Sequence, residues 1–197
     1  IQEQNSYAGI TNKFLAKNAK KICVAYPKME QFFPASKIQM TGNPVRKDIL
    51  NVASKRQQAF EHFGLQPDKP TVLVIGGSQG AKTINESIDG GLTSLVNEGC
   101  QVVWQTGKLY IERAKKAAEV FTGKVYVSDF IYEMDLAYAM ADIVVSRAGA
   151  LSVSELCLAG KPSILVPLPT AAEDHQTKNA LALVKENAAI LIADTAA

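Results

Sequence analysis

The chain has 197 residues, of which 47% are hydrophobic and 20% are charged, and its formal net charge is +2. This composition is sufficient for a packed core and excludes a disordered chain. The small net charge gives no reason to expect nucleic-acid binding, and no apolar run reaches the roughly 18 residues that a transmembrane helix needs.

Short apolar runs typical of buried strands recur along the chain, separated by segments whose apolar residues have helical spacing. The predicted strands are residues 21–25, 38–41, 71–75, 101–105, 125–128, 142–146, 163–166 and 189–192. The predicted helices are residues 54–63, 81–96, 111–120, 134–141, 151–159 and 175–185. Strands that are apolar throughout and alternate with helices are typical of a parallel sheet covered on both faces, so we expect an α/β fold.

The stretch TGNPVRKDIL, residues 41–50, is the predicted domain boundary, because Asn-Pro favours extended or turn geometry. We expect residues 1–43 to be the end of one α/β unit and residues 44–197 to be most of a second. The chain begins without Met and ends directly after an apolar run, with no helix following it. We therefore expect a fragment of a longer protein.

The stretch VLVIGGSQGA, residues 72–81, runs from a predicted strand into a glycine-rich turn that precedes a predicted helix. Such a turn often receives a phosphate, because the start of a helix offers unpaired N–H groups and a positive dipole end. Gly76, Gly77 and Gly80 depart from the dinucleotide pattern G-x-G-x-x-G, and Ala81 replaces a glycine of the P-loop pattern. These departures count against a dehydrogenase and an ATPase, while a tight turn without a ligand stays open.

A second strand, glycine turn and helix follow in ADIVVSRAGALSVSEL, residues 141–156, with Gly149 in the turn and a helix predicted from about Ser152. Two such turns at the carboxyl ends of parallel strands bring two helix N-termini to one crevice. Ser152 and Glu155 have the spacing of a capping box, in which each side chain bonds the other residue's backbone. Alternatively, the Glu155 carboxylate accepts hydrogen bonds from a ribose diol, and both interpretations stay open.

A third polar segment, PLPTAAEDHQTKNALAL at residues 167–183, is a loop with two prolines followed by a predicted helix. His175, Gln176 and Asn179 lie within about one turn of that helix, so they can face one way. They fit a binding surface, and they also fit an ordinary solvated helix start. No DxD pair or metal-type cluster accompanies the three segments in the sequence, so we expect no bound metal and no other cofactor.

Four segments occur in an order and at spacings that resemble the MurG family of transferases: GNPVR (42–46), GGSQGA (76–81), SRAGALSVSEL (146–156) and EDHQTKNA (173–180). The opening QEQNSYAGITNKFLA also resembles this family. The resemblance implies a glycosyltransferase-B fold of two Rossmann-like domains. Residues 1–43 are then the remnant of the N-terminal acceptor domain, and residues 44–197 are the UDP-sugar donor domain, truncated at its C-terminus.

The resemblance also implies an activity. Members of the family move N-acetylglucosamine from UDP-N-acetylglucosamine to the acceptor lipid I, with inversion at the anomeric carbon, and so make lipid II for peptidoglycan, cell shape and cell division. They are peripheral on the cytoplasmic face of the plasma membrane. The catalytic base proposed for the family belongs to the N-terminal part that this chain lacks, so we expect the fragment to bind the donor without turnover.

Two alternatives stay open beside this interpretation. One is another UDP-sugar enzyme of the same fold, for instance one that moves galactose from UDP-galactose to diacylglycerol. The other is a non-catalytic module that binds a nucleotide sugar.

The donor site implied by the resemblance is assembled from several segments. Ser78 contacts the diphosphate, the backbone of Ile131 reads uracil, and Glu155 binds the ribose hydroxyls. Gln176 contacts the sugar hydroxyls, and Asn5 reaches the N-acetylglucosamine from the other domain. The complete set of implied contacts is Asn5, Arg46, Ser78, Ile131, Ala150, Leu151, Ser152, Val153, Ser154, Glu155 and Gln176. The supporting loop positions are Gly76, Gly77, Gln79, Gly80, Gly149 and His175, the last of which is often Gln in the family.

Overall fold

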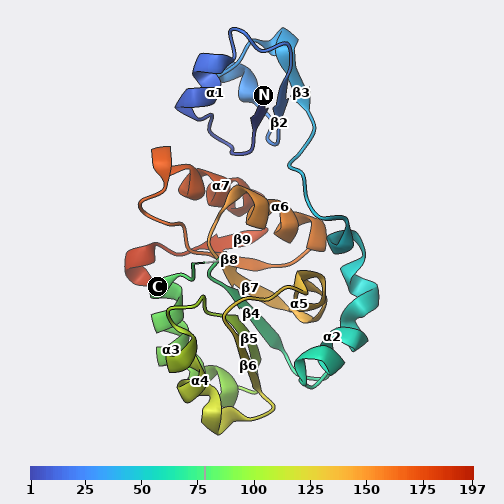
Figure 1. The fold of residues 1–197 in the computed structure, drawn as a ribbon, viewed down its shortest axis with the longest axis vertical. Coiled ribbons are helices and arrows are strands. Elements are labelled where there is room, and N and C mark those ends of the chain that lie inside the picture. Colours follow the sequence, from blue (N-terminus) through green and yellow to red (C-terminus); the bar gives the residue numbers. More distant parts are fainter. Residues whose placement is uncertain (78) are drawn as a thin grey trace.

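The computed structural model describes residues 1–77 and 79–197 and contains two parallel sheets (Figure 1). The smaller sheet, at the end of the molecule that carries the N-terminus, has the order β1-β2-β3. Its strands are β1 (Gln2–Glu3), β2 (Ile22–Val24) and β3 (Ile38–Met40). The larger sheet has the order β6-β5-β4-β7-β8-β9. Its strands are β4 (Thr71–Ile75), β5 (Gln101–Gln105), β6 (Val125–Ser128), β7 (Ile143–Ser146), β8 (Ser163–Leu165) and β9 (Ala189–Leu191).

The order of the larger sheet is that of a doubly wound, Rossmann-like fold. From β4 the chain adds β5 and β6 on one side, and then it returns to add β7, β8 and β9 on the other. The register pairs Ile75, the last residue of β4, with Ser146, the last residue of β7. The loops that leave these two strands therefore start side by side, at the switch point of the sheet. The predicted α/β fold with a parallel sheet is confirmed.

The helices alternate with the strands along the chain, as the spacing of apolar residues predicts. A 3-10 segment, Lys47–Lys55, leads from the end of the linker into α2. The α-helices are α1 (Ile10–Leu15), α2 (Arg56–Phe63), α3 (Lys82–Asn97), α4 (Ile111–Ala118), α5 (Met134–Met140), α6 (Ala150–Ala159) and α7 (His175–Val184). Within the described residues, no helix is long and apolar enough to cross a bilayer.

Helices cover both faces of the larger sheet, which explains why its central strand is apolar throughout. All five residues of β4 are buried, with Leu73 and Ile75 in one core and Val72 and Val74 in the other. The first core is closed by α2, α5, α6 and α7, and the second by α3 and α4. The smaller sheet has a core of its own around Ile22.

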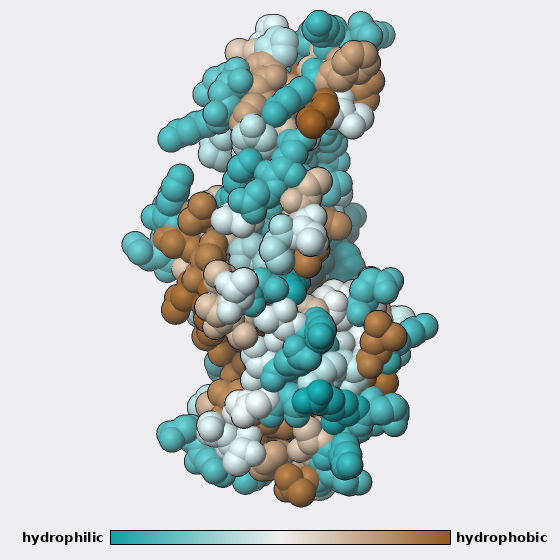
Figure 2. Space-filling model, turned by 90° about the vertical axis from the view of Figure 1, so that its left-hand side faces the viewer, coloured by the Kyte–Doolittle hydropathy of each residue, from teal (hydrophilic) through white to brown (hydrophobic). Residues whose placement is uncertain are grey.

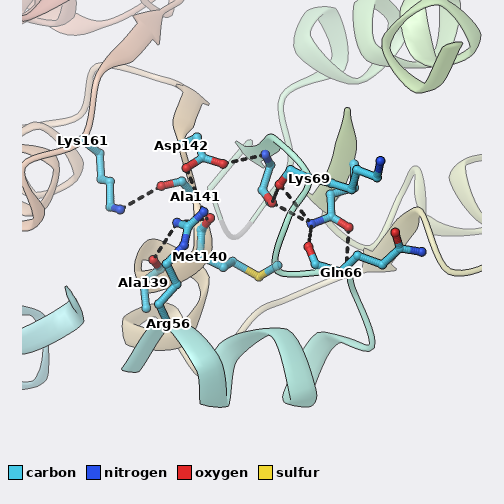
Figure 3. A network of polar contacts seen from close by, with 10 residues as sticks. Arg56, Gln66, Lys69, Ala139, Met140, Ala141, Asp142 and Lys161 are labelled. Carbon is cyan, nitrogen blue, oxygen red and sulfur yellow. Dashed lines mark hydrogen bonds and ion pairs between the residues drawn. The ribbon is translucent and has the colours of Figure 1, made fainter. Parts of the chain in front are cut away.

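A polar network closes the edge of the larger sheet at which the strands begin (Figure 3). Arg56 on α2 donates to the carbonyl oxygen of Met140 at 3.0 Å and pairs with Asp142 at 2.9 Å. Lys161 donates to the carbonyl oxygen of Ala141 at 2.8 Å. Both cations thus lie at the C-terminal end of α5, where they donate hydrogen bonds to carbonyl groups and are attracted by the negative end of the helix dipole. This end of α5 is therefore fixed from two other elements.

Besides α1, which is absent from the predicted helices, two details of the predicted elements differ from the structure. The strand β1 carries no apolar run that a sequence pattern could detect, and it is placed by pairing in parallel with Cys23 and Val24 of β2. The helix α6 begins at Ala150, earlier than Ser152, with Gly149 in the extended conformation before it. The second difference changes the interpretation of two side chains at the candidate site.

Candidate functional site

The loops after β4 and β7 line an open cavity of about 550 Å3 at the switch point of the larger sheet. The first glycine turn contributes Gly76 and Gly80 to its lining, and the second contributes Gly149. Ser152 on α6 and Gln176 at the start of α7 also line it. The three segments that the sequence analysis selected for their polar and glycine residues therefore meet at one place.

The first turn is tight because its glycines have no side chains. Gly77 and Gly80 both have φ of +76°, and a Cβ on Gly80 would lie 2.2 Å from the carbonyl oxygen of Thr106. A Cβ on Gly76 would lie 2.6 Å from the backbone nitrogen of Ala81. The helix α3 follows directly, and no side-chain cap is found for it among the described residues. No described side chain satisfies its first N–H groups, which suits them to a ligand.

Two neighbouring positions of this turn have different outcomes. Gln79 lines the cavity, and its role in the supporting loop stays a prediction. Ser78 lies outside the described residues, so its predicted contact with a diphosphate stays a prediction.

The second turn places a helix start beside the first, but it does not form the capping box that the sequence allowed. Gly149 is the N-cap of α6, and its carbonyl oxygen accepts from the N–H of Val153 at 2.9 Å. Ser152 already lies in the first turn of the helix, so it cannot occupy the non-helical position that a capping side chain needs. The capping-box interpretation of Ser152 and Glu155 is therefore wrong, and Glu155 bonds elsewhere.

Glu155 connects α6 to a neighbouring helix and to the linker. Its Oε2 accepts a hydrogen bond of 3.0 Å from the hydroxyl of Tyr138 on α5. Its Oε1 lies 3.7 Å from Nε of Arg46, whose side chain is 45% exposed against 19% for Glu155. Burial raises the pKa of Tyr138, and the adjacent Glu155 carboxylate raises it further, so the phenol remains a hydrogen-bond donor. The carboxylate keeps acceptor positions that are open toward the exposed Arg46 side.

The other residues of this stretch of α6 point in different directions. Leu151 is exposed and Val153 is buried in the core. The hydroxyl of Ser154 donates to the carbonyl oxygen of Ala150 at 2.9 Å and accepts from Nδ2 of Asn43 in the linker at the same distance. The consecutive set 150–155 is thus brought to the site as a helix start, and not as a row of side chains facing one cavity.

Gln105 joins the first glycine turn to the loop that contains Ile131. Its side chain is buried at the end of β5, with Nε2 donating to the carbonyl oxygen of Gly77 at 3.1 Å. Its Oε1 accepts from the N–H of Ile131 at 3.0 Å. Gln105 is not among the predicted site residues, although a polar residue directly after the apolar run 102–104 was a signal for it.

Arg147, in the second turn, is directed toward the end of β8 and the end of the chain. Its Nη1 donates to the carbonyl oxygens of Val166 and Pro167 at 3.1 and 3.2 Å, and it also pairs with the carboxylate of Asp194. The other oxygen of Asp194 accepts from the hydroxyl of Thr83 at 3.0 Å. The guanidinium therefore connects the second turn to the loop after β8 and to Asp194. The Asp194 carboxylate, which lines the same cavity, neutralises its charge.

The polar side chains at the start of α7 point in different directions and have different hydrogen-bond partners. Oε1 of Gln176 accepts from the N–H of Leu168 at 3.0 Å, beside the cavity. The ring of His175 bonds the carbonyl oxygen of Ala172 in its own turn. Asn179 is fully buried and turns toward the smaller sheet. The expectation that His175, Gln176 and Asn179 share one direction is therefore wrong.

Asn5 lies in the loop after β1, opposite α7. Its Nδ2 donates to Oε1 of Glu3 at 3.3 Å, and its Oδ1 accepts from Nδ2 of Asn179 at 3.0 Å. Asn179 also donates to the carbonyl oxygen of Ala148 at 3.4 Å. The structure thus brings Asn5 to the boundary between the two sheets. Asn179 lies between Asn5 and the second glycine turn and bonds both.

The geometry defines a class of protein. A doubly wound parallel sheet with two tight glycine turns at its switch point, each followed by a helix start, is the arrangement with which Rossmann-like α/β proteins bind nucleotides. Among the described residues, no group of three or more His, Cys, Asp or Glu side chains is arranged to hold a metal ion.

Comparison with known proteins narrows this class to a family. The family model of the glycosyltransferase family 28 C-terminal domain matches residues 71–197. The chain is 60% identical, over 98% of its own length and 53% of the relative's, to the UDP-N-acetylglucosamine--N-acetylmuramyl-(pentapeptide) pyrophosphoryl-undecaprenol N-acetylglucosamine transferase of Parabacteroides distasonis. It is 58% identical to the transferase of the same name from Cytophaga hutchinsonii, over 98% of this chain and 52% of that one. The chain belongs to glycosyltransferase family 28.

A solved structure agrees with the sequence comparisons. The crystal structure of Acinetobacter baumannii MurG is 37% identical and superposes with a TM-score of 0.75, covering 99% of this chain and 53% of that one. The resemblance to the MurG family and the glycosyltransferase-B fold class predicted from four motifs are thereby confirmed. The chain spans about half the length of the curated relatives it matches.

Proposed function

We propose that this chain is the donor-binding half of an inverting transferase that moves N-acetylglucosamine from UDP-N-acetylglucosamine to lipid I, forming lipid II for peptidoglycan. The observation that carries the proposal is the cavity at the switch point, where two glycine turns and the start of α7 converge. The relatives named for this transfer, at up to 60% identity, support the choice of donor and acceptor.

The diphosphate of the donor belongs at the two turns, with Ser78 and the first N–H groups of α3 and α6 as donors. Sugar transfer leaves a charged diphosphate, and donors that are already in place stabilise that charge without reorganisation. A helix dipole contributes about 0.3–1 kcal/mol when exposed and up to about 2 kcal/mol when partly buried. The total reduction of the barrier must exceed about 8 kcal/mol, so alignment of donor and acceptor has to supply much of the rest.

The uridine and the sugar extend from the diphosphate in two directions. The backbone of Ile131 reads uracil through its carbonyl oxygen, because its N–H already bonds Gln105. Glu155 accepts from the ribose hydroxyls, and Arg46 contacts the nucleotide from the linker. Gln176 lines the cavity and contacts the sugar hydroxyls. Asn5 reaches the N-acetyl sugar from the smaller sheet, where its bond with Asn179 holds it near α7. The remaining positions of 150–154 support this site through the helix start that they form.

The smaller sheet is proposed to be the remnant of the acceptor domain. Its helix α1 exposes 71% of Ile10 and 77% of Phe14, an apolar surface that suits packing against further chain. Figure 2 shows the side of the molecule that carries α1, where tan and brown residues in the upper part are scattered among hydrophilic ones and a longer brown band lies farther down. In the full-length enzyme this half binds lipid I and contacts the cytoplasmic face of the plasma membrane, which flotation of the full-length protein with phospholipid vesicles would test.

Calorimetric titration of the 197-residue chain with UDP-N-acetylglucosamine, UDP-galactose, UDP, ATP and NAD tests the donor site. We expect the uridine ligands to bind, with UDP-N-acetylglucosamine preferred over UDP-galactose, and ATP and NAD to give no heat. At 100 times its dissociation constant, a ligand should stabilise the chain by about 2.7 kcal/mol. The variant Glu155→Ala should lose uridine binding. Binding of ATP or NAD without UDP would contradict the proposal, as would transfer to lipid I by this chain alone at the rate of a full-length enzyme.

A further inference from the structure

A buried phenol holds the carboxylate that the proposed function assigns to the ribose. Tyr138 is 1% exposed and belongs to the main core, although its ring carries a hydroxyl. That hydroxyl donates to Oε2 of Glu155 at 3.0 Å. A buried hydroxyl needs a partner, and a hydrogen bond to a charged acceptor is stronger than one between neutral groups. The pair therefore constrains the carboxylate at the surface from inside the core.

The helix that carries the phenol is itself fixed at both ends. At its first turn, Asp135 pairs with Lys55 at 2.6 Å. At its last turn, Arg56 and Lys161 donate to the final carbonyl groups, as Figure 3 shows. Because α5 is anchored at its two ends and packed along its length, the hydroxyl of Tyr138 has a defined position.

The hydrogen bond from Tyr138 gives the two oxygens of the Glu155 carboxylate different surroundings. Oε2 is directed to the phenol, while Oε1 is directed to the exposed side, where Arg46 lies 3.7 Å away. An ionised carboxylate accepts about four hydrogen bonds, so acceptor positions remain after the phenol has donated. A ribose diol offers two adjacent hydroxyl donors to such a carboxylate.

We propose that Tyr138 is a positioning residue for the donor nucleotide: it orients Glu155 so that the carboxylate presents its open acceptor positions to the two ribose hydroxyls. The inference rests on the proposed function, because it assumes that a uridine nucleotide binds here. It adds a residue that touches no part of the nucleotide and that acts only through Glu155. The buried Tyr138 then contributes, through Glu155, to the preference for ribose over deoxyribose.

The test is a comparison of UDP with 2′-deoxy-UDP by calorimetry on the 197-residue chain. Tyr138→Phe should weaken UDP binding roughly tenfold, the loss expected for a hydrogen bond to a charged group. It should weaken binding of 2′-deoxy-UDP much less, so that the preference for UDP shrinks. Tyr126→Phe, which removes a hydroxyl from β6, is the matched control and should leave both affinities unchanged.

A second variant, Glu155→Gln, tests the same inference if Tyr138→Phe folds poorly. In Glu155→Gln the amide oxygen faces the phenol, which leaves the NH2 group facing the ribose side, so UDP binding should fall as far as in Glu155→Ala. Retention of near-normal UDP binding by Glu155→Gln would overturn the inference, because it would mean that the side chain is free to turn. Equal losses for UDP and 2′-deoxy-UDP in Tyr138→Phe would also overturn it, since they indicate a general structural effect.

The failure of this inference differs from failure of the proposed function. If the unchanged chain binds no UDP, both fall together. If UDP binds and Glu155→Ala abolishes binding while Tyr138→Phe leaves it intact, only the positioning role of Tyr138 is overturned.

Discussion

Asn179 donates a hydrogen bond from its side-chain amide to Oδ1 of Asn5, at 3.0 Å, across the boundary between the two sheets. Oδ1 of Asn179 accepts at the same time from the N–H of Ser6, at 2.9 Å. One fully buried amide on α7 therefore satisfies two groups of the loop that follows β1. The smaller sheet is held to the larger one next to the proposed sugar site.

Replacing Asn179 with Leu should lower the free energy of unfolding by about 1–3 kcal/mol, because the half-buried groups of Asn5 and Ser6 lose their partner. Urea denaturation measures this loss. Asn97→Leu is the control, since Asn97 is exposed at the end of α3 and should change stability by no more than about 0.5 kcal/mol. Equal effects of the two variants would contradict the role assigned to Asn179.

Gly80→Ala should destabilise the chain through both conformation and contact. Its φ is +76°, and the new Cβ would lie 2.2 Å from the carbonyl oxygen of Thr106. The left-handed conformation costs about 1–2 kcal/mol for an L-residue, and overpacking adds about 1–3 kcal/mol. Denaturation of the variant measures the sum, and titration with UDP should show loss of binding.

The chain contains a matched control for that substitution. Gly99 has φ of +83°, but a Cβ there would meet nothing within 4 Å. Gly99→Ala should therefore show only the conformational cost of about 1–2 kcal/mol and should keep UDP binding. If both alanine variants lose the same stability, close packing of the first turn against the Thr106 loop is not what requires glycine at position 80.

Gln105→Leu should break the connection between the first glycine turn, proposed to bind phosphate, and the loop of Ile131, proposed to bind the base. The substitution leaves the carbonyl oxygen of Gly77 and the N–H of Ile131 without their shared partner. We expect a stability loss of about 1–3 kcal/mol and a smaller preference for UDP over CDP. Gln57→Leu on the exposed face of α2 is the control. An unchanged ratio of the two affinities would show that Gln105 does not position the loop of Ile131.

The pair of Asp135 and Lys55 should make stability depend on pH in the acid range. Burial opposes the ionisation of Asp135, but the hydrogen bond and charge of Lys55 outweigh it and hold the pKa of Asp135 below its usual 3.8. A carboxyl whose pKa is lowered by folding contributes stability above its unfolded pKa, and this contribution is lost as the pH falls through the folded pKa. The contribution of this pair is therefore present above about pH 4 and lost below it.

Asp135→Asn removes this titration. Compared with the unchanged chain, the variant should be less stable by about 1 kcal/mol at pH 6, and the difference should shrink toward pH 3. Denaturation curves at the two pH values give the comparison. A difference that is constant with pH would show that Asp135 contributes through packing and not through its charge.

The sequence predicted the middle of the larger sheet most directly because strands such as β4 and β5 are buried on both faces. A strand such as β4, in which residues 72–75 all lie in one of two cores, has a continuous apolar run that needs no knowledge of its neighbours. β1 lacks such a run and exists only because β2 lies beside it. The start of α6 was placed too late because the spacing of Ser152 and Glu155 fits a cap, whereas Gly149 occupies that position in space.

The candidate site was predictable in part for a related reason. The glycine turns and the polar start of α7 are local patterns, and they do meet at one cavity. The bonds of Tyr138 to Glu155 and of Gln105 to Gly77 and Ile131 join elements that are distant in the chain. No local pattern specifies such pairs, because they depend on which helices and loops are packed together.

The pairing of Ile75 with Ser146 has a kinetic consequence. The cavity cannot exist before β7 has joined β4, because each strand supplies one of its walls. A nucleotide bound as proposed can therefore contact both walls only after these two strands have paired. Interactions that are absent from the folding transition state slow unfolding and leave the folding rate unchanged. Occupancy of the cavity should lengthen the lifetime of the folded chain without making it assemble faster.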